Sequence, residues 1–191
     1  MASRIVVSML AALLVMPGVG LAQRDPPATE PATFAMSEEY LDIQRRALNV
    51  QRNILLAMAD SMPERLYRDR ATPAQRDFAQ QIHHVVSSSV LVANWWGQNV
   101  NRTDFQGDTA TVFNSRSALK AYINWGYDDL EELLVSQTAE DRDTRVRFFN
   151  GEFMPRWQVW DELHQHAFWT LGQVVANFRK HGMAPPAFLF F

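Results

Sequence analysis

The chain contains no cysteine among its 191 residues, which removes several classes of site at once. It can form no disulfide bond, and it has no thiolate for nucleophilic catalysis, redox exchange or a zinc–thiolate centre. Any metal ion would therefore be bound by histidine, by carboxylates or by neutral oxygen ligands. The fold must be held together by its apolar core, and a chain of this length buries enough surface for that.

Other absences narrow the function further. The 18 basic and 21 acidic residues give a formal net charge of −3, which provides no reason to expect nucleic acid or an anionic membrane as a partner. Neither a glycine-rich phosphate loop nor a Gly-x-Ser-x-Gly nucleophile motif is present. The carboxylates at Asp128, Asp129, Glu131 and Glu132 fall on several faces of one predicted helix, which indicates a solvated surface.

Residues 1–22 have the parts of a secretory signal peptide: Arg4, an apolar run over residues 5–16, and small residues before position 23. The run is short for a membrane span and no stop-transfer charges follow it, although a retained membrane anchor is the alternative. We expect the mature chain to begin at Gln23, to be exported to a bacterial periplasm and to have no stable membrane insertion. Cleavage removes Arg4 and changes the formal charge from −3 to −4.

Residues 23–35 contain three prolines and few large apolar side chains, which predicts an extended tether. The remainder, residues 36–191, is of a length typical of one domain. It shows no internal repeat and no sustained alternation of apolar and polar residues, so strands are not indicated.

Four segments of this domain have helical periodicity. The first begins after the N-cap Ser37 and ends at residues 61–63, and its apolar positions recur every three or four residues at Tyr40, Ile43, Ala47, Val50, Ile54 and Met58. The second is predicted to begin at Thr72 with Pro73 in the first helical position. The third spans about residues 114–136. The fourth follows Pro155 and ends at Gly182. These segments predict an all-α four-helix bundle.

Two pairs of histidines lie on different predicted helices: His83 and His84 on the second, and His164 and His166 on the fourth. Histidines on separate helices of a bundle are able to form a metal site. Periodicity alone places His164 nearer the centre of the apolar face than His166. The alternative is that none binds metal: two are surface residues, one is a hydrogen-bonded core histidine and one packs on aromatic rings.

Two segments, RDFAQQIHHVVSSSVLVANWW (residues 76–96) and LHQHAFWTLGQVVANFRKHGMAPPAF (residues 163–188), resemble the DinB-like family of four-helix-bundle proteins. The resemblance covers all four helices, and these two segments carry its specific features. Aligned on Phe78, the family's second-helix histidine is His84. Aligned on Gly172-Gln173, Gly182 and Pro185-Pro186, the first histidine of its last helix is His166.

The resemblance implies a divalent metal site, with zinc, nickel or manganese bound between the second and fourth helices. The family's third ligand position is Thr170 here, and a neutral hydroxyl is a poor ligand for such ions. Glu162, one turn before His166, is a candidate substitute. The alternatives are weak binding through two histidines and water, or a vacant site.

The family's known activities include metal-assisted thiol transfer and hydrolysis. In an oxidising compartment we expect hydrolysis of a small amide or ester rather than thiol transfer. The competing expectation is a non-catalytic bundle that binds a small ligand or a partner without metal. Tryptophans near the histidines, among the six of the chain, would then line a cavity, although core filling is the favoured explanation of most of them. Trp169 points away from the apolar face, and the resemblance makes a homodimer a reasonable expectation.

Overall fold

The computed structural model describes residues 37–96 and 107–187. The predicted signal peptide, the tether, residues 188–191 and the side chains of Trp95 and Trp96 lie outside the described part of the chain. Within that part, no helix combines the length and the apolar character needed to cross a membrane.

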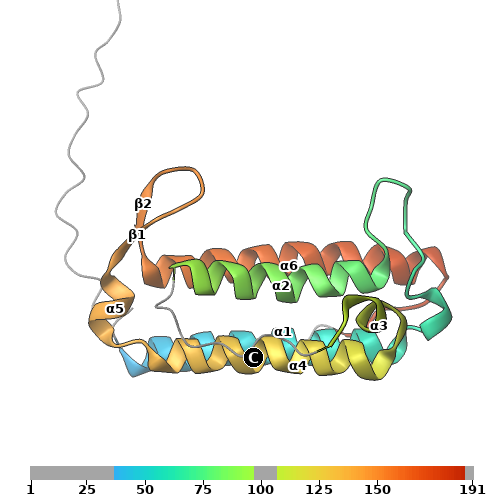
Figure 1. Cartoon of the computed structure of the whole chain (residues 1–191), viewed down its shortest axis with the longest axis horizontal. Helices are drawn as coiled ribbons and strands as arrows, with labels where there is room; N and C mark the ends of the chain where they lie inside the picture. The colour runs from blue at the N-terminus through green and yellow to red at the C-terminus, as the bar shows by residue number, and fades with distance from the viewer. Residues whose placement is uncertain (1–36, 97–106, 188–191) are drawn as a thin grey trace, which may run out of the picture. The chain divides into compact units, whose positions relative to one another are not determined.

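Four long helices dominate the structure, which confirms the predicted all-α bundle (Figure 1). They are α1 (Glu38–Ser61), α2 (Phe78–Trp96), α4 (Arg116–Ser136) and α6 (Arg156–Lys180). Short elements connect them: the 3-10 helix η1 (Glu64–Leu66), α3 (Thr109–Asn114), α5 (Ala139–Asp143), and an antiparallel pair of strands, β1 (Arg145–Arg147) and β2 (Phe153–Pro155).

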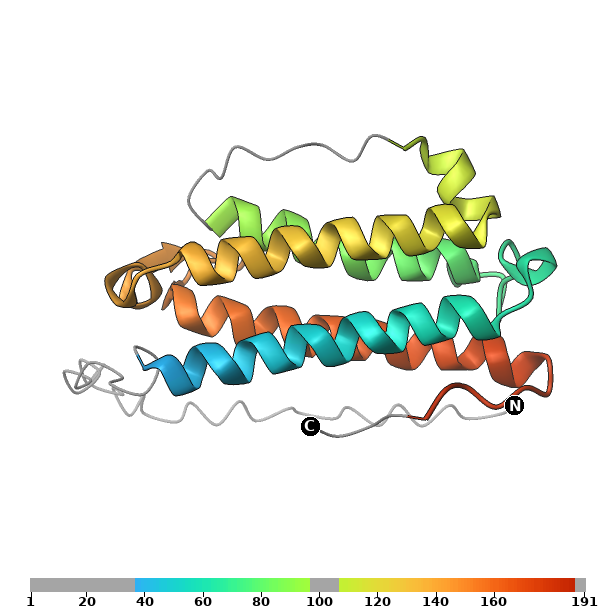
Figure 2. The ribbon, with the colours of Figure 1, turned by 90° about the horizontal axis from the view of Figure 1, so that it is seen from below.

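The helix directions are up, down, down and up. Helices α1 and α6 run one way and α2 and α4 run the other (Figures 1 and 2). Helix α2 packs beside both α6 and α4, and α1 packs beside α4. Helices α2 and α4 are therefore parallel neighbours. The histidine-bearing helices α2 and α6 are therefore antiparallel neighbours.

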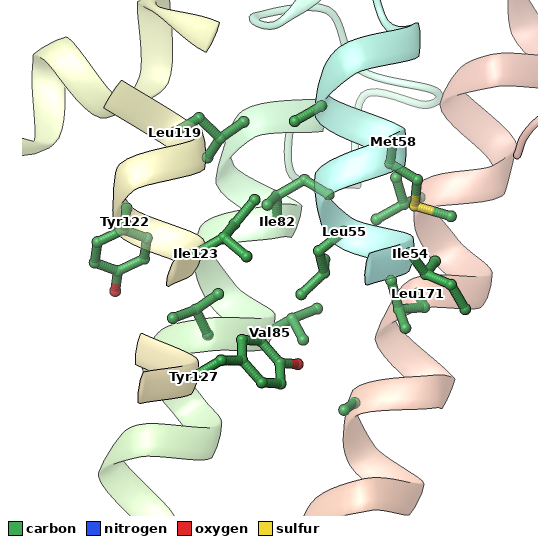
Figure 3. Packing of buried hydrophobic residues seen from close by; sticks show 14 of the residues in the cluster. Ile54, Leu55, Met58, Ile82, Val85, Leu119, Tyr122, Ile123, Tyr127 and Leu171 are labelled. Carbon is green, nitrogen blue, oxygen red and sulfur yellow. The ribbon is translucent and has the colours of Figure 1, made fainter. Parts of the chain in front are cut away.

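The core is formed by apolar side chains from all four long helices (Figure 3). Leu55 of α1, Ile82 of α2, Leu119 and Ile123 of α4, and Val174 of α6 are fully buried. The buried residues of each long helix recur every three or four positions, which places them on one face of that helix. Burial of this apolar surface is the main stabilising contribution in a chain without disulfides.

The inward face of α1 differs from the predicted one by a rotation about the helix axis. Ile43 and Val50, predicted on the apolar face, are only half-buried, whereas Gln44 and Gln51 are buried. A polar side chain enters a core at little cost only when it is hydrogen-bonded there. The partners of these two glutamines are described with the histidines below.

The predicted start of the second helix is wrong. Helix α2 begins at Phe78, and residues 72–75 form a turn before it. The Asp77 carboxylate accepts a hydrogen bond from the Gln80 backbone N–H (2.8 Å), and the Gln80 side chain accepts one from the Asp77 N–H (3.2 Å). This reciprocal pair is a capping box, and it satisfies donors that a helix start leaves unpaired. Thr72 and Pro73 are residue types that are common at the start of a helix, but the N-cap of α2 is Asp77.

The other predicted helix ends agree with the structure to within two residues. Ser37 accepts a hydrogen bond from the Tyr40 N–H and caps α1. Helix α4 begins at Arg116 after the N-cap Ser115, against a predicted start near residue 114. Helix α6 begins directly after Pro155, and Gly182, with a φ of +67°, follows its C-terminal end.

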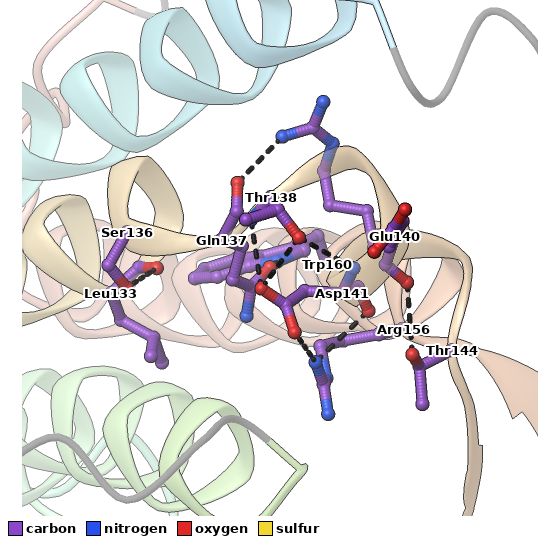
Figure 4. Close-up of polar contacts among 10 residues, drawn as sticks. Leu133, Ser136, Gln137, Thr138, Glu140, Asp141, Thr144, Arg156 and Trp160 are labelled. Atoms are coloured by element: carbon purple, nitrogen blue, oxygen red, sulfur yellow. Dashed lines mark hydrogen bonds and ion pairs between the residues drawn. The ribbon is translucent and has the colours of Figure 1, made fainter.

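The segment between α4 and α6 contains elements that periodicity did not predict (Figure 4). Thr138 and Asp141 form a capping box at the start of α5. Trp160 donates its indole N–H to the Gln137 side-chain oxygen (3.0 Å), and Arg156 donates to the Asp141 carbonyl (3.0 Å). Because these bonds join Gln137 and α5 to the first turns of α6, such short elements depend on tertiary contacts rather than on local sequence.

Candidate metal centre and buried histidine network

Two of the four histidines considered above, His84 and His166, meet at the edge where α2 and α6 lie side by side. The rings of His84 and His166 have centroids 5.3 Å apart and are nearly perpendicular, with an interplanar angle of 83°. His166 is exposed and His84 is half-buried, so both rings are accessible to solvent. The structure thus brings together two predicted ligands that are 82 residues apart in the sequence.

Burial favours the neutral form of both imidazoles, which is the form that a metal ligand requires. Desolvation lowers the pKa of His84, and the nearby charges of Arg76, His166 and His83 lower it further. Desolvation, followed by the charge of Arg76, also lowers the pKa of His166. The guanidinium of Arg76 therefore disfavours protonation of either ring, and the same charge attracts an anionic group.

The other two predicted ligand positions do not complete a cluster. Thr170 is buried, with 2% of its surface exposed, whereas His166 one turn earlier is exposed. Glu162 is half-buried on α6. Within the described residues, no group of three or more His, Asp or Glu side chains is placed to hold a metal ion. The donor set at this edge is therefore two imidazoles, which leaves room for water or a ligand at the other coordination positions.

His83, next to His84, faces a different neighbour. Its ring stacks on Tyr122 of α4, with centroids 4.6 Å apart and planes inclined by 4°, and meets the edge of Phe113. Desolvation lowers its pKa. Consecutive helical residues point about 100° apart, so His83 packs against α3 and α4 while His84 faces α6. His83 therefore corresponds to the histidine that, in the metal-free alternative of the sequence analysis, packs on aromatic rings.

His164 is the inward histidine, as periodicity predicted, and it is 8% exposed. Its Nδ1 lies 2.7 Å from Nε2 of Gln51, and its Nε2 lies 2.6 Å from Oε1 of Gln44. Gln51 also accepts a hydrogen bond from the Tyr127 hydroxyl (3.2 Å), and Gln44 donates to Asp161 (2.9 Å). Five side chains from α1, α4 and α6 thus form one continuous hydrogen-bonded chain.

The donors and acceptors of this chain all run in one direction. The Tyr127 hydroxyl has only one hydrogen to donate, so the oxygen of Gln51 accepts it and the Gln51 amide N–H faces His164 Nδ1. Nδ1 must then accept, which leaves the proton on Nε2 and directs it to the Gln44 oxygen. Burial lowers the pKa of His164 to about 4, consistent with a neutral ring.

Sequence reasoning nominated His164 but missed its partners. The available signal was in the first helix, where Gln44 and Gln51 are seven residues apart and therefore on one face. They lie between the apolar positions Tyr40, Ala47 and Ile54. Two polar residues on an apolar face indicate a buried hydrogen-bonded group on a facing helix.

Of the tryptophans whose side chains the structure describes, Trp160 lies in the core, Trp125 and Trp157 are half-buried, and Trp169 is exposed. Trp160 is buried and hydrogen-bonded, whereas Trp169 is 75% exposed on the outer side of α6. A hollow of about 330 Å³ opens at one end of the bundle, where Leu41, Arg45 and Arg142 are among its lining residues. No histidine lines this hollow, so it is separate from the pair at the α2–α6 edge.

Comparisons with known proteins identify the fold. No protein-family model matches the chain, and no curated protein matches its sequence. Among solved structures, a DinB-like protein from Bacillus cereus is similar, with a TM-score of 0.56 and 19% sequence identity. The match covers 82% of this chain and 99% of that protein. The protein therefore has the four-helix-bundle fold of a DinB-like protein, as the resemblance of its sequence predicted.

Proposed function

We propose that this protein binds a divalent transition-metal ion through His84 and His166 and that it hydrolyses a small ester or amide beside them. The observation that carries the proposal is the pairing of these two imidazoles from α2 and α6, with ring centroids 5.3 Å apart at a solvent-accessible edge. Imidazole is a preferred ligand of zinc, nickel and related ions, and burial favours its neutral form here.

The residues of the site suit such a role in three respects. The two rings would hold the ion, and the half-buried Glu162 lies one turn before His166 on α6. The charge of Arg76, which acts on both rings, would orient the negative oxygen that develops during acyl transfer. A divalent ion supplies Lewis acidity, which polarises a carbonyl group and lowers the pKa of water.

The proposed metal site predicts a specific pattern of zinc binding. The mature chain, purified without chelators, should bind about one equivalent of zinc, nickel or manganese, measured by mass spectrometry and by titration. His84→Ala and His166→Ala should each lose the ion and the hydrolytic activity, because one imidazole with water is a weak site.

His181→Ala is the matched control. His181 pairs with Asp69 (2.6 Å) at the far end of α6 and is accessible to adventitious ions. This variant should keep the ion and the activity. Hydrolysis that persists in both His84→Ala and His166→Ala would refute the catalytic proposal.

The second candidate is a binding bundle that has lost the metal. It is favoured by the burial of Thr170, the position at which the sequence lacks a third imidazole. The titration separates the two candidates, because a wild-type protein that takes up no divalent ion even in excess would support the metal-free bundle.

We also propose that the protein is exported after cleavage behind Ala22. The support is the signal-like composition of residues 1–22. The full chain expressed in a bacterial host should appear in the periplasmic fraction, and its intact mass should correspond to a chain that starts at Gln23. Recovery of uncleaved protein in the membrane fraction would instead indicate a retained anchor.

A further inference from the structure

Ser88 lies one helical turn after His84 on α2 and beside the ring of His166. Its Oγ is 2.5 Å from the backbone carbonyl oxygen of His84 and 3.3 Å from that of Val85. The same Oγ is 3.4 Å from Nδ1 of His166 across the interface between the helices. One hydroxyl group thus contacts the backbone of one proposed ligand and the ring of the other.

The direction of these hydrogen bonds follows from what each group is able to donate. A serine hydroxyl has one hydrogen, and a carbonyl oxygen only accepts, so the short contact to His84 uses that hydrogen. The Ser88 oxygen then has only lone pairs to offer to His166. The contact with Nδ1 is therefore favourable only when Nδ1 carries the proton and donates it to Ser88.

This assignment determines which nitrogen of His166 is free to bind a metal. In a neutral imidazole, one nitrogen carries a proton and the other has a lone pair. With the proton on Nδ1, the lone pair is on Nε2. Since 3.4 Å exceeds the usual range for an N–H···O bond, the contact is weak, and its effect is on the balance between tautomers rather than on stability.

We propose that Ser88 is the positioning residue of the metal site, selecting the Nδ1–H tautomer of His166 and so presenting Nε2 as the ligand atom. The inference rests on the proposed function for the identity of the ligand. Metal-binding histidines generally donate their second ring N–H to a neighbouring acceptor, which fixes the ring and the tautomer. Ser88 also couples the two ligands, because its hydroxyl is anchored on the His84 backbone.

The same geometry excludes a nucleophilic role for Ser88. A nucleophilic serine donates its hydrogen to a base that removes the proton. Here the hydrogen is donated to the carbonyl of His84, which cannot act as that base. Ser88 therefore acts through His166 and not on a substrate.

Nitrogen-15 NMR of histidine-labelled, metal-free protein at mildly alkaline pH tests the tautomer directly, with His166 assigned by comparison with His166→Ala. We expect the Nδ1–H form in the wild type and a shift to the Nε2–H form in Ser88→Ala. The zinc dissociation constant, measured by titration on the same samples, should rise about 10- to 100-fold in Ser88→Ala.

Two further variants separate positioning from a general structural effect. Ser87→Ala is the matched control, because Ser87 Oγ also contacts the His84 carbonyl (3.4 Å) and the contacts described for its hydroxyl do not include His166. It should keep both the tautomer and the zinc affinity. Ser88→Thr retains a hydroxyl that bonds to the carbonyl one turn earlier, and it should restore both.

The outcomes distinguish this inference from the proposed function. An Nε2–H form of His166 in the wild type, or an Nδ1–H form that persists in Ser88→Ala, would overturn the role of Ser88 even if zinc binds. A wild-type protein with the Nδ1–H form that binds no zinc would refute the metal site and would still support tautomer selection by Ser88.

Discussion

Acidification from about pH 7.5 to about pH 5 should lower the free energy of unfolding by about 2 kcal/mol through His164 alone. The pKa of this ring is about 4 in the folded protein, because burial disfavours its charged form. In the unfolded chain it has the ordinary histidine value of about 6.5. Each unit of difference is worth about 1.4 kcal/mol, so the full effect below pH 4 is about 3 kcal/mol.

The sign follows from the number of protons bound in each state. Between pH 6.5 and 4 the unfolded chain binds a proton at residue 164 and the folded protein does not, so falling pH favours unfolding. The contribution of His164 to stability is fully present above pH 6.5. It is lost progressively as the pH falls towards 4.

Other groups act in the same pH range and have to be separated from His164. The pKa values of His83, His84 and His166 are also lowered, chiefly by desolvation, so these rings change stability in the same direction. Asp161, at the end of the chain of hydrogen bonds, has a pKa raised by desolvation. Its protonation stabilises the folded state at low pH and opposes the histidines there.

His164→Gln is the variant that isolates the effect. A glutamine amide has an oxygen to accept from Gln51 and an N–H to donate to Gln44, so it preserves the direction of the chain without a titratable ring. Urea unfolding of both proteins at several pH values should show that the wild type loses about 2 kcal/mol of unfolding free energy relative to His164→Gln between pH 7.5 and 5. If the stability of the two proteins depended on pH in the same way, the pKa of His164 would be the same in the folded protein as in the unfolded chain.

The histidines show what a single sequence is able to predict and where it fails. Helical phase correctly placed His164 inside, because a period of 3.6 residues fixes which side chains share a face. It could not identify Gln44 and Gln51 as its partners, which are more than 110 residues away in the chain. The pairing of His84 with His166 came from family resemblance, since helical phase alone placed His84 well off the apolar face and His166 farther from its centre than His164.

The wrong start predicted for the second helix has a physical cause. Thr72-Pro73 has the residue types of a helix start, yet the Phe78 N–H bonds to the Asp69 carbonyl and the Ala79 N–H to the Tyr67 carbonyl. These bonds hold the preceding segment as a loop that folds back on the start of α2. Tertiary hydrogen bonds outweigh a local propensity of a few tenths of a kcal/mol, and they cannot be deduced from residue types at one end of a helix.

Gly126→Ala should destabilise the protein by about 1 to 2 kcal/mol, and Gly126→Val by about 3 kcal/mol. Gly126 is buried in the middle of α4, and a Cβ atom there would lie 2.2 Å from Cγ1 of Val86 on α2. Val86 is fully buried and β-branched, so its side chain has no second favourable rotamer to move into. The helices must separate instead, which costs more than the gain of about 1 kcal/mol from replacing a helical glycine.

Gly172→Ala is the matched control, because Gly172 is exposed on α6 and a Cβ there would have no atom within 4 Å. This substitution should stabilise the protein by about 0.5 to 1 kcal/mol. Removing the obstacle provides a second check. In Gly126→Ala/Val86→Ala, the loss should be smaller than the sum of the two single losses by at least about 0.5 kcal/mol. Strict additivity would mean that the two side chains do not meet.

If alanine lowers the stability of the protein at position 126 and raises it at position 172, the result would connect the packing of the bundle to its candidate site. Helix propensity predicts the same gain at both positions, so only the close approach of α4 to α2 explains a loss at Gly126. That approach lies one turn from the stacking of His83 on Tyr122. It therefore fixes the position of the segment of α2 that carries His84. A bulkier residue at 126 should displace α2 and weaken zinc binding at His84 and His166, although it contacts neither ring.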